Sequence, residues 1–138
     1  MISKDRIQHI LHVANLMKEK AESLGLDKEE MFTLGLLHDI GYEFTNNDEH
    51  CIVGFKILEK QNYKYAKEVL CHGKPNCEYF SPALDLLNYA DMHIDNKGNY
   101  VSFEQRLEDI KNRRGVSSQA FTNSKLIIIE LQNKKFLK

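Results

Sequence analysis

Residues that break helices are scarce in this sequence. Its 138 residues include only two prolines and seven glycines. Proline and glycine interrupt helices, so their scarcity leaves room for long helical segments. No stretch approaches the roughly 18 apolar residues of a membrane span, and we expect no membrane partner. With 42% hydrophobic residues the chain can bury one core, so we expect residues 1–138 to form a single domain.

An excess of charge of either sign is also lacking. Nineteen basic residues stand against twenty acidic ones, which gives a net charge of -1. There is no overall field to hold a polyanion, so we expect no stable binding of nucleic acid. Residues 1–6 are charged and lack the apolar core of a signal peptide, which predicts a cytoplasmic location. The sequence leaves open whether the chain forms a homodimer.

Cysteine is rare as well. The three cysteines are Cys51, Cys71 and Cys77. Their number is odd and no two have Cys-x-x-Cys spacing, which argues against a disulfide framework and against a structural zinc site. We therefore expect three reduced thiols, of which Cys51 and Cys71 each adjoin a histidine.

Apolar residues recur at helical spacing along most of the chain. The run at 126–129 has the composition of a buried strand, but a single strand would have no partner. The sequence therefore predicts an all-α, compact helical bundle. Helices are expected over 4–24 with Gly25 as the stop, from Asp27 to the 38–39 pair, over 49–60 after a turn at 46–48, over 63–71, from Pro82 after the cap Ser81, from the capping box at 102–105 to Arg114, and after Ser117 or Ser118.

A histidine–aspartate pair ends the second predicted helix. His38 and Asp39 follow an apolar run, and Gly41 comes two residues after the pair. Imidazole and carboxylate are ligands for divalent first-row metals. Adjacent side chains on a helix point about 100° apart, so the pair shares one metal only over a helix end, where we expect Gly41 to stop the helix. Alone, such a pair often occurs by chance and usually only caps a helix.

Other side chains that bind metals lie beside apolar helical faces. His9 is at the edge of the first apolar face, and consecutive helices joined by a short turn run antiparallel, which brings His38 back toward it. His50 lies in the first turn of its predicted helix and His72 at the end of another. Asp91 follows an inward apolar face, where a carboxylate is rarely buried without a cation.

Together these residues resemble the HD superfamily of metal-dependent phosphohydrolases, which are all-helical proteins named for a His-Asp pair. The resemblance implies that His9, His38, Asp39 and Asp91 hold one divalent metal. It implies that His50 and His72 complete a second metal site or hold the substrate phosphate. The implied metal is Mn, Fe, Ni, Co or Zn, with one or two ions per chain. The matching residues are Arg6-x-x-His9-x-x-x-Val13-Ala14, Leu36-Leu37-His38-Asp39-Ile40-Gly41, His50 with Gly54, His72, and Ala90-Asp91.

The resemblance also implies a chemistry. The substrate would be a small phosphorylated metabolite, a nucleotide first among them, whose phosphate ester or anhydride is hydrolysed. Asp39 would orient the attacking water, and His50 or His72, where free of metal, would protonate the leaving oxygen. Many relatives have lysine after His-Asp-Ile-Gly, whereas this chain has Tyr42, which donates a hydrogen bond without a charge. Lys74, beside His72, is the candidate replacement, and a solvated loop lysine is the alternative.

Two other functions stay open at the level of sequence. Some relatives use a di-iron centre for oxidation, so a metal-dependent oxygenase is one alternative. A domain that binds a nucleotide without chemistry is the other. The complete set of six ligands argues against the non-catalytic domain, because binding alone does not require all of them.

Overall fold

The computed structural model describes residues 2–45, 47 and 49–137. Within them the chain folds into seven α-helices, and the one extended pairing in this part is a single β-bridge between Ile94 and Tyr100. The prediction of an all-α bundle is confirmed. The elements are α1 (Lys4–Ala21), the 3-10 turn η1 (Glu22–Leu24), α2 (Lys28–Leu37), the 3-10 turn η2 (Ile40–Glu43), α3 (His50–Lys60), α4 (Ala66–Cys71), α5 (Pro82–His93), α6 (Phe103–Arg114) and α7 (Gln119–Asn133).

The predicted helix caps account for most of these boundaries. The side chains of Asp27, Ser81 and Ser118 each accept a hydrogen bond from the backbone N–H three residues further on, which satisfies a donor that the helix itself leaves unpaired. Ser102 and Gln105 form the reciprocal capping box. Gly25 adopts the left-handed conformation that ends the first helical segment. Of the predicted turn at 46–48, residues 46 and 48 lie outside the described residues.

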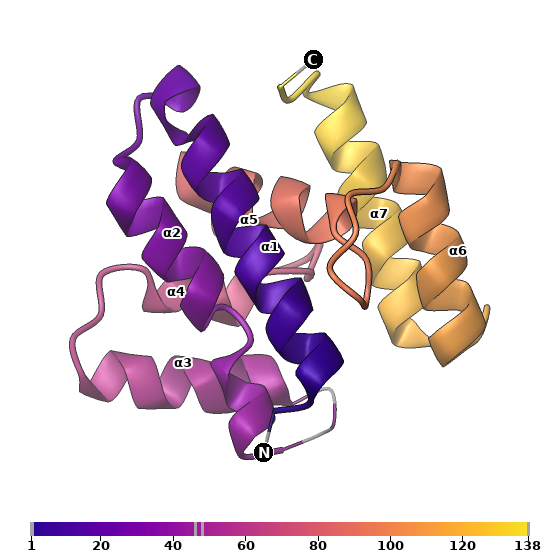
Figure 1. Ribbon diagram of the computed structural model, residues 1–138, viewed down its shortest axis with the longest axis horizontal. Helices are drawn as coiled ribbons and strands as arrows, with labels where there is room; N and C mark the ends of the chain where they lie inside the picture. Colours follow the sequence, from indigo (N-terminus) through magenta and orange to yellow (C-terminus); the bar gives the residue numbers. More distant parts are fainter. Residues whose placement is uncertain (1, 46, 48, 138) are drawn as a thin grey trace.

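Helices α1 and α2 lie side by side and antiparallel, as Figure 1 shows. Gly35 of α2 makes the close approach possible, because a Cβ there would overlap the backbone of Ala14 in α1. Fully buried apolar side chains, among them Val13, Met17 and Leu34, fill the space beneath the pair. This packing brings the end of α2 back along α1, as the short turn between them predicted.

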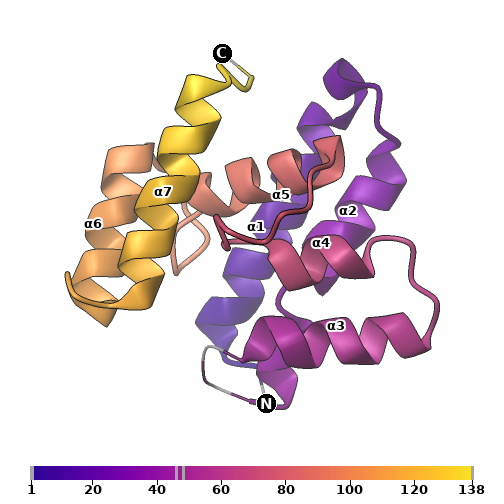
Figure 2. The ribbon, with the colours of Figure 1, turned by 180° about the vertical axis from the view of Figure 1, so that it is seen from behind.

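Helix α5 runs through the middle of the molecule and packs against α1, α2, α4, α6 and α7. Helices α6 and α7 form a pair beside it, away from α3, and both ribbon views agree on this arrangement (Figures 1 and 2). The strand-like run at 126–129 lies within α7, so the prediction of a helix there is confirmed. Ile127 and Ile128 of this run are buried in the core.

Gly41 does not end a helix through the left-handed conformation, contrary to our expectation. It lies inside η2 and is absent from the glycines with positive φ. An added Cβ at Gly41 would lie 2.6 Å from the carbonyl carbon and 2.9 Å from Cα of His50, and closer still to the carbonyl oxygen. Glycine is needed here because the backbone at the start of α3 crosses directly over it.

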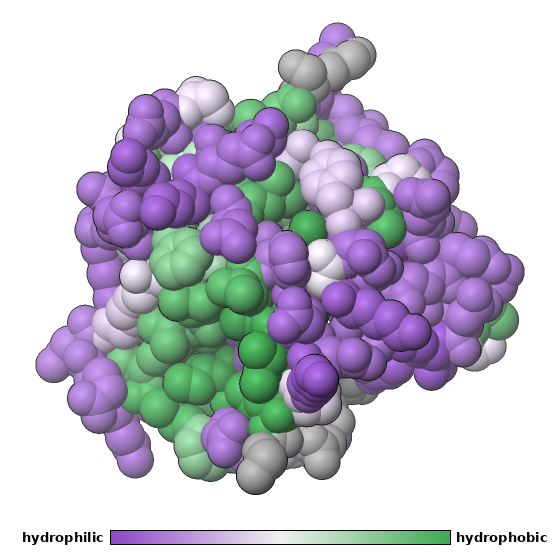
Figure 3. Space-filling model, viewed as in Figure 1, coloured by the Kyte–Doolittle hydropathy of each residue, from purple (hydrophilic) through white to green (hydrophobic). Residues whose placement is uncertain are grey.

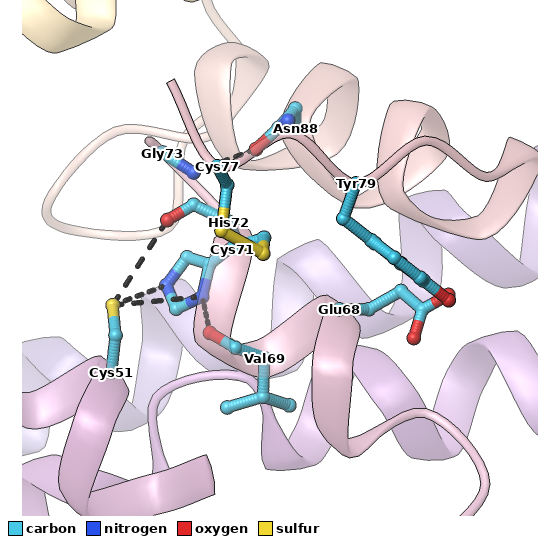
Figure 4. The surroundings of a disulfide bond; sticks show 9 residues. All are labelled: Cys51, Glu68, Val69, Cys71, His72, Gly73, Cys77, Tyr79 and Asn88. Carbon is cyan, nitrogen blue, oxygen red and sulfur yellow. Dashed lines mark hydrogen bonds between the residues drawn. A yellow bond between two sulfur atoms is a disulfide. The ribbon is translucent and has the colours of Figure 1, made fainter. Parts of the chain in front are cut away.

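The expectation of three reduced thiols is wrong for two of them. Cys71 and Cys77 form a disulfide, and Cys51 is the free, buried cysteine. Gly73, at φ 71°, reverses the chain after α4 and brings the two Cα atoms within 5.6 Å of each other, inside the range a disulfide can bridge. The bond closes the loop that carries His72 and Lys74, as Figure 4 shows for His72.

The surface differs between the two parts of the molecule. In the view of Figure 3, apolar side chains gather where α2, α3 and the neighbouring end of α1 lie in Figure 1, and hydrophilic side chains cover α6 and α7. Exposed apolar residues of the first part include Ile7, Leu36 and Ile52. In the described part of the chain, no helix is both long and apolar enough to cross a membrane.

Candidate metal centre

Three helices bring four predicted ligands together in the interior. His9 comes from α1, His38 and Asp39 from the end of α2, and Asp91 from the last turn of α5. His9 Nε2 lies 2.8 Å from Asp91 Oδ1. His38 Nε2 lies 3.2 Å from Asp39 Oδ2 and 3.6 Å from Asp91 Oδ1. All four residues are buried, so a polar cluster replaces apolar core at this point.

The remaining two predicted ligands approach Asp39 from its other side. His50 Nε2 is 3.4 Å and His72 Nε2 is 3.3 Å from Asp39 Oδ1. The second carboxylate oxygen, Oδ2, faces His9 and His38. Asp39 therefore presents one oxygen to each of two histidine pairs, so either pair could hold a cation together with this carboxylate.

All four histidines are oriented in the same way. Each has Nδ1 against a backbone carbonyl oxygen and Nε2 toward the carboxylates. A carbonyl only accepts hydrogen bonds, so Nδ1 carries the proton and Nε2 is left to bind. Ligating histidines in metalloproteins are held by such outer contacts. The distances from Nδ1 are 3.0 Å for His9 to Asp95 O, 2.6 Å for His38 to Gly35 O, 3.3 Å for His50 to Asn47 O and 2.6 Å for His72 to Val69 O.

His38 supplies a direct test of whether a metal fits. Its Nε2 is fully buried and, despite the nearby carboxylate oxygens, has no hydrogen-bond partner among the described residues. A buried polar atom without a partner costs free energy, and a cation would satisfy it. His9, His38 and Asp91 offer ligand atoms that all lie within 4.8 Å of one another. This mixed set of nitrogen and oxygen donors fits a divalent transition metal.

The electrostatics of the metal-free protein are consistent with a cation site. Burial alone would lower the pKa of His38, but Asp39 and Asp91 outweigh it and raise that pKa to about 9. Burial would raise the pKa of Asp39, yet His38 and the other histidines hold it well below its usual value. For His9 burial prevails over Asp91 and lowers the pKa. In the metal-free protein, the proton on His38 thus balances the negative charge of the two carboxylates, as a bound metal would.

Arg6 and Tyr42 form the wall of the site beside Asp39. The guanidinium Nη1 of Arg6 donates a hydrogen bond to Asp39 Oδ2 at 3.1 Å and lies over the Tyr42 ring, 4.3 Å from its centroid. Tyr42 in turn stacks on His50, with ring centroids 3.9 Å apart. Tyr42 thus lies beside Asp39 and His50. Arg6 is part of the family pattern, but we predicted no role for it from the sequence. Its position one helical turn before His9 places it on the same side of α1, and this could have indicated a site residue.

Arg106 is a site residue that the sequence reasoning missed. Its side chain is buried in the core between α5 and α6. The Nε group donates to the backbone oxygen of Asp91 at 3.0 Å, and Nη2 lies 3.7 Å from Asp91 Oδ1. Arg106 adds a permanent positive charge beside the buried Asp91, next to His9 and His38. The available signal was its position four residues before Ile110, on the apolar face of α6.

A cavity of about 280 Å³ opens onto this cluster. Asp39, Asp91, His50 and His72 form part of its wall, and Lys74 lines it from the loop after α4. Lys74 is half-buried there. Five cations surround the cavity, and this excess favours an anionic ligand. They are Arg6, Lys74, Arg106, Arg113 and Arg114.

Comparisons with known proteins identify the family of the chain. The HD domain family matches residues 6–113, and the chain belongs to that family. Family membership implies a metal-dependent phosphohydrolase that binds divalent metals. The chain is 37% identical over 116 residues to a ribonuclease Y of Protochlamydia amoebophila, covering 75% of this chain and 22% of the relative.

Other relatives match over shorter segments. A ribonuclease Y of Mycoplasma capricolum is 40% identical over 58 residues, which is 41% of this chain and 11% of the relative. An uncharacterised protein of Clostridium beijerinckii is 35% identical over 71 residues, 47% of this chain and 45% of the relative. The chain thus spans less than half the length of each of these relatives. No solved structure gives a significant match.

Proposed function

We propose that this chain hydrolyses a phosphate ester or anhydride in a small phosphorylated metabolite, first among them a nucleotide, with a divalent transition metal. One observation carries the proposal. Four histidines, each with Nδ1 on a backbone carbonyl, direct Nε2 at two buried carboxylates on the wall of a cavity surrounded by cations. Such a site binds metal on one side and an anion on the other.

His9, His38, Asp39 and Asp91 would hold one metal, and His50 and His72 would join Asp39 around a second. A divalent metal supplies positive charge against the phosphoryl oxygens and a water that ionises near neutral pH. The protein's own contribution is to hold these ligands without rearrangement, because every one of the four imidazoles is already oriented by the backbone.

The side chains at the cavity perform the remaining steps. Asp39 accepts a hydrogen bond from the attacking water and orients it. Arg6 and Lys74 bind the phosphoryl oxygens and hold the phosphorus in line with that water. His50 lies on the cavity wall with 14% of its side chain exposed. In protein that holds a single metal, His50 or His72 is free to pass a proton to the leaving oxygen.

The size of the cavity favours a small substrate. About 280 Å³ is at the lower end of ligand pockets, which run from about 300 to 1,000 Å³. A metabolite of nucleotide size fills it, whereas a polymer would have to leave most of its length outside. The name ribonuclease Y of several relatives makes an RNA phosphodiester the second substrate class to test.

The test is release of phosphate or nucleotide product from a panel of substrates. Nucleoside monophosphates, dinucleoside polyphosphates, cyclic dinucleotides and a short RNA are each incubated with the protein and manganese, cobalt or zinc. His38→Ala and Asp39→Ala are expected to abolish turnover and to stay helical. His12→Ala, an exposed histidine of α1, is the matched control and keeps full activity. Activity that survives in either site variant, or oxygen consumption without hydrolysis, would contradict the proposal.

A further inference from the structure

The free cysteine points into the same cluster. Cys51 lies in the first turn of α3, directly after His50, and only 4% of it is exposed. Figure 4 shows its side chain directed at the imidazole of His72, across the space between α3 and α4. Its Sγ is 3.5 Å from His50 Nε2 and 3.8 Å from His72 Nε2. The usual role of a buried cysteine, that of a small apolar filler, does not explain the imidazole nitrogens of two histidines at these distances.

Four distances among the proposed donor atoms are close to those between ligands of one metal ion. Metal–nitrogen and metal–oxygen bonds of about 2.0–2.1 Å and a metal–sulfur bond of about 2.3 Å place tetrahedral ligands about 3.3 Å apart, or about 3.5 Å where one of them is sulfur. In this protein Asp39 Oδ1 is 3.3 Å from His72 Nε2 and 3.4 Å from His50 Nε2. The Cys51 sulfur lies 3.5 Å from His50 Nε2 and 3.8 Å from both ring nitrogens of His72, which is close to the longer edges.

A second observation points to a bound ligand. His72 is buried and its Nδ1 is occupied by the carbonyl oxygen of Val69 at 2.6 Å. Its Nε2 faces Asp39 Oδ1 at 3.3 Å and the Cys51 sulfur at 3.8 Å. His50, Cys51 and His72 offer ligand atoms that all lie within 4.8 Å of one another, and all three residues line the cavity. A metal could reach them from solvent.

We propose that Cys51 is a thiolate ligand of a divalent metal held together with His50, His72 and Asp39. On binding, the thiol proton passes to solvent and the sulfur donates an electron pair to the metal. Thiolate is a soft ligand, so this site selects zinc, cobalt or iron(II) over manganese and magnesium. The inference rests on the proposed function in one respect, since both place a metal at Asp39.

Cobalt(II) absorption tests the assignment without any turnover. A thiolate bound to cobalt(II) gives an intense charge-transfer band in the near ultraviolet, which nitrogen and oxygen ligands do not give. The metal-free protein is titrated with cobalt(II), and the expected result is this band with an end point at one thiolate per chain. In Cys51→Ser the band is absent, and zinc competes against manganese at least about tenfold less well than in the unmodified protein.

The matched control removes the other two sulfur atoms. The double variant Cys71→Ser with Cys77→Ser lacks the disulfide, and it is expected to keep the band because it retains Cys51. Circular dichroism checks that each variant is folded, and the unmodified protein decides the matter even where Cys51→Ser does not fold. Cobalt bound without a charge-transfer band overturns the role of Cys51 and leaves the metal-dependent function standing. No cobalt bound at all overturns both.

Discussion

Replacing Gly41 with alanine tests how closely the site depends on the position of α3. The added Cβ would lie 2.6 Å from the carbonyl carbon of His50, whereas ordinary contacts of this kind are about 3.5–4.0 Å. The overlap is with backbone, so no side-chain rotation relieves it. The start of α3 must move away from η2, and His50 and Cys51 move with it.

The size of the effect follows from the displacement. Restoring normal contact requires a shift of more than about 1 Å, because the carbonyl oxygen of His50 is closer still, and a misplacement of about 1 Å already costs about 100-fold in rate where catalytic groups must be aligned. Overpacking of a tight interior site destabilises a protein by about 1–3 kcal/mol. Gly41→Ala is therefore expected to fold with a lowered midpoint of thermal unfolding and to lose about 100-fold in kcat/KM.

The assay is hydrolysis of the best substrate, together with thermal unfolding and metal content. Gly54→Ala is the matched control, because its added Cβ meets its nearest neighbours at 3.3–3.4 Å, which a small adjustment accommodates. It should keep activity within a fewfold of the unmodified protein. If Gly41→Ala kept full activity and stability, the reasoning that the His50 backbone must cross over a glycine would be refuted.

Three further predictions concern the rest of the site. Gly35→Ala forces α1 and α2 apart and is expected to lower the free energy of unfolding by about 1–3 kcal/mol, measured by urea denaturation. Arg106→Met removes the permanent positive charge beside the buried Asp91 and should cost about 3 kcal/mol in the same assay of metal-free protein. Metal affinity should rise with pH toward about 9, with proton release measured by calorimetry in different buffers. The reason is that, despite burial, nearby carboxylates raise the pKa of His38 and His50 to about 9, so a metal must displace those protons.

Each of these three predictions would be contradicted by a different result. Unchanged stability of Gly35→Ala would show that the two helices tolerate a wider separation. An Arg106→Met variant as stable as the parent would mean that Asp91 finds water or another cation. Metal affinity independent of pH between 6 and 9 would mean that the imidazoles of the metal-free protein are neutral.

Local signals in the sequence determined most of the helices. Capping side chains at Asp27, Ser81 and Ser102 act on amides three residues away, so their effect can be read without knowing the rest of the fold. The six candidate ligands were found in the same way, because each lies beside an apolar helical face or at a helix end, and both features can be read from nearby residues in the sequence. Such a motif depends on residues that are near one another in the sequence and on which face of a helix is buried, so it can be recognised without the tertiary structure.

Only the tertiary structure decided the contacts between distant segments. The pairing of Cys71 with Cys77, the cation that Arg106 supplies to Asp91, and the approach of Cys51 to His72 depend on how loops turn and at what distance helices pack. Gly41 shows the difference most clearly: the sequence marks it as a helix stop, whereas the fold uses its missing side chain to admit the His50 backbone. Such contacts are set by packing in three dimensions, to within a fraction of an ångström, and no local spacing encodes them.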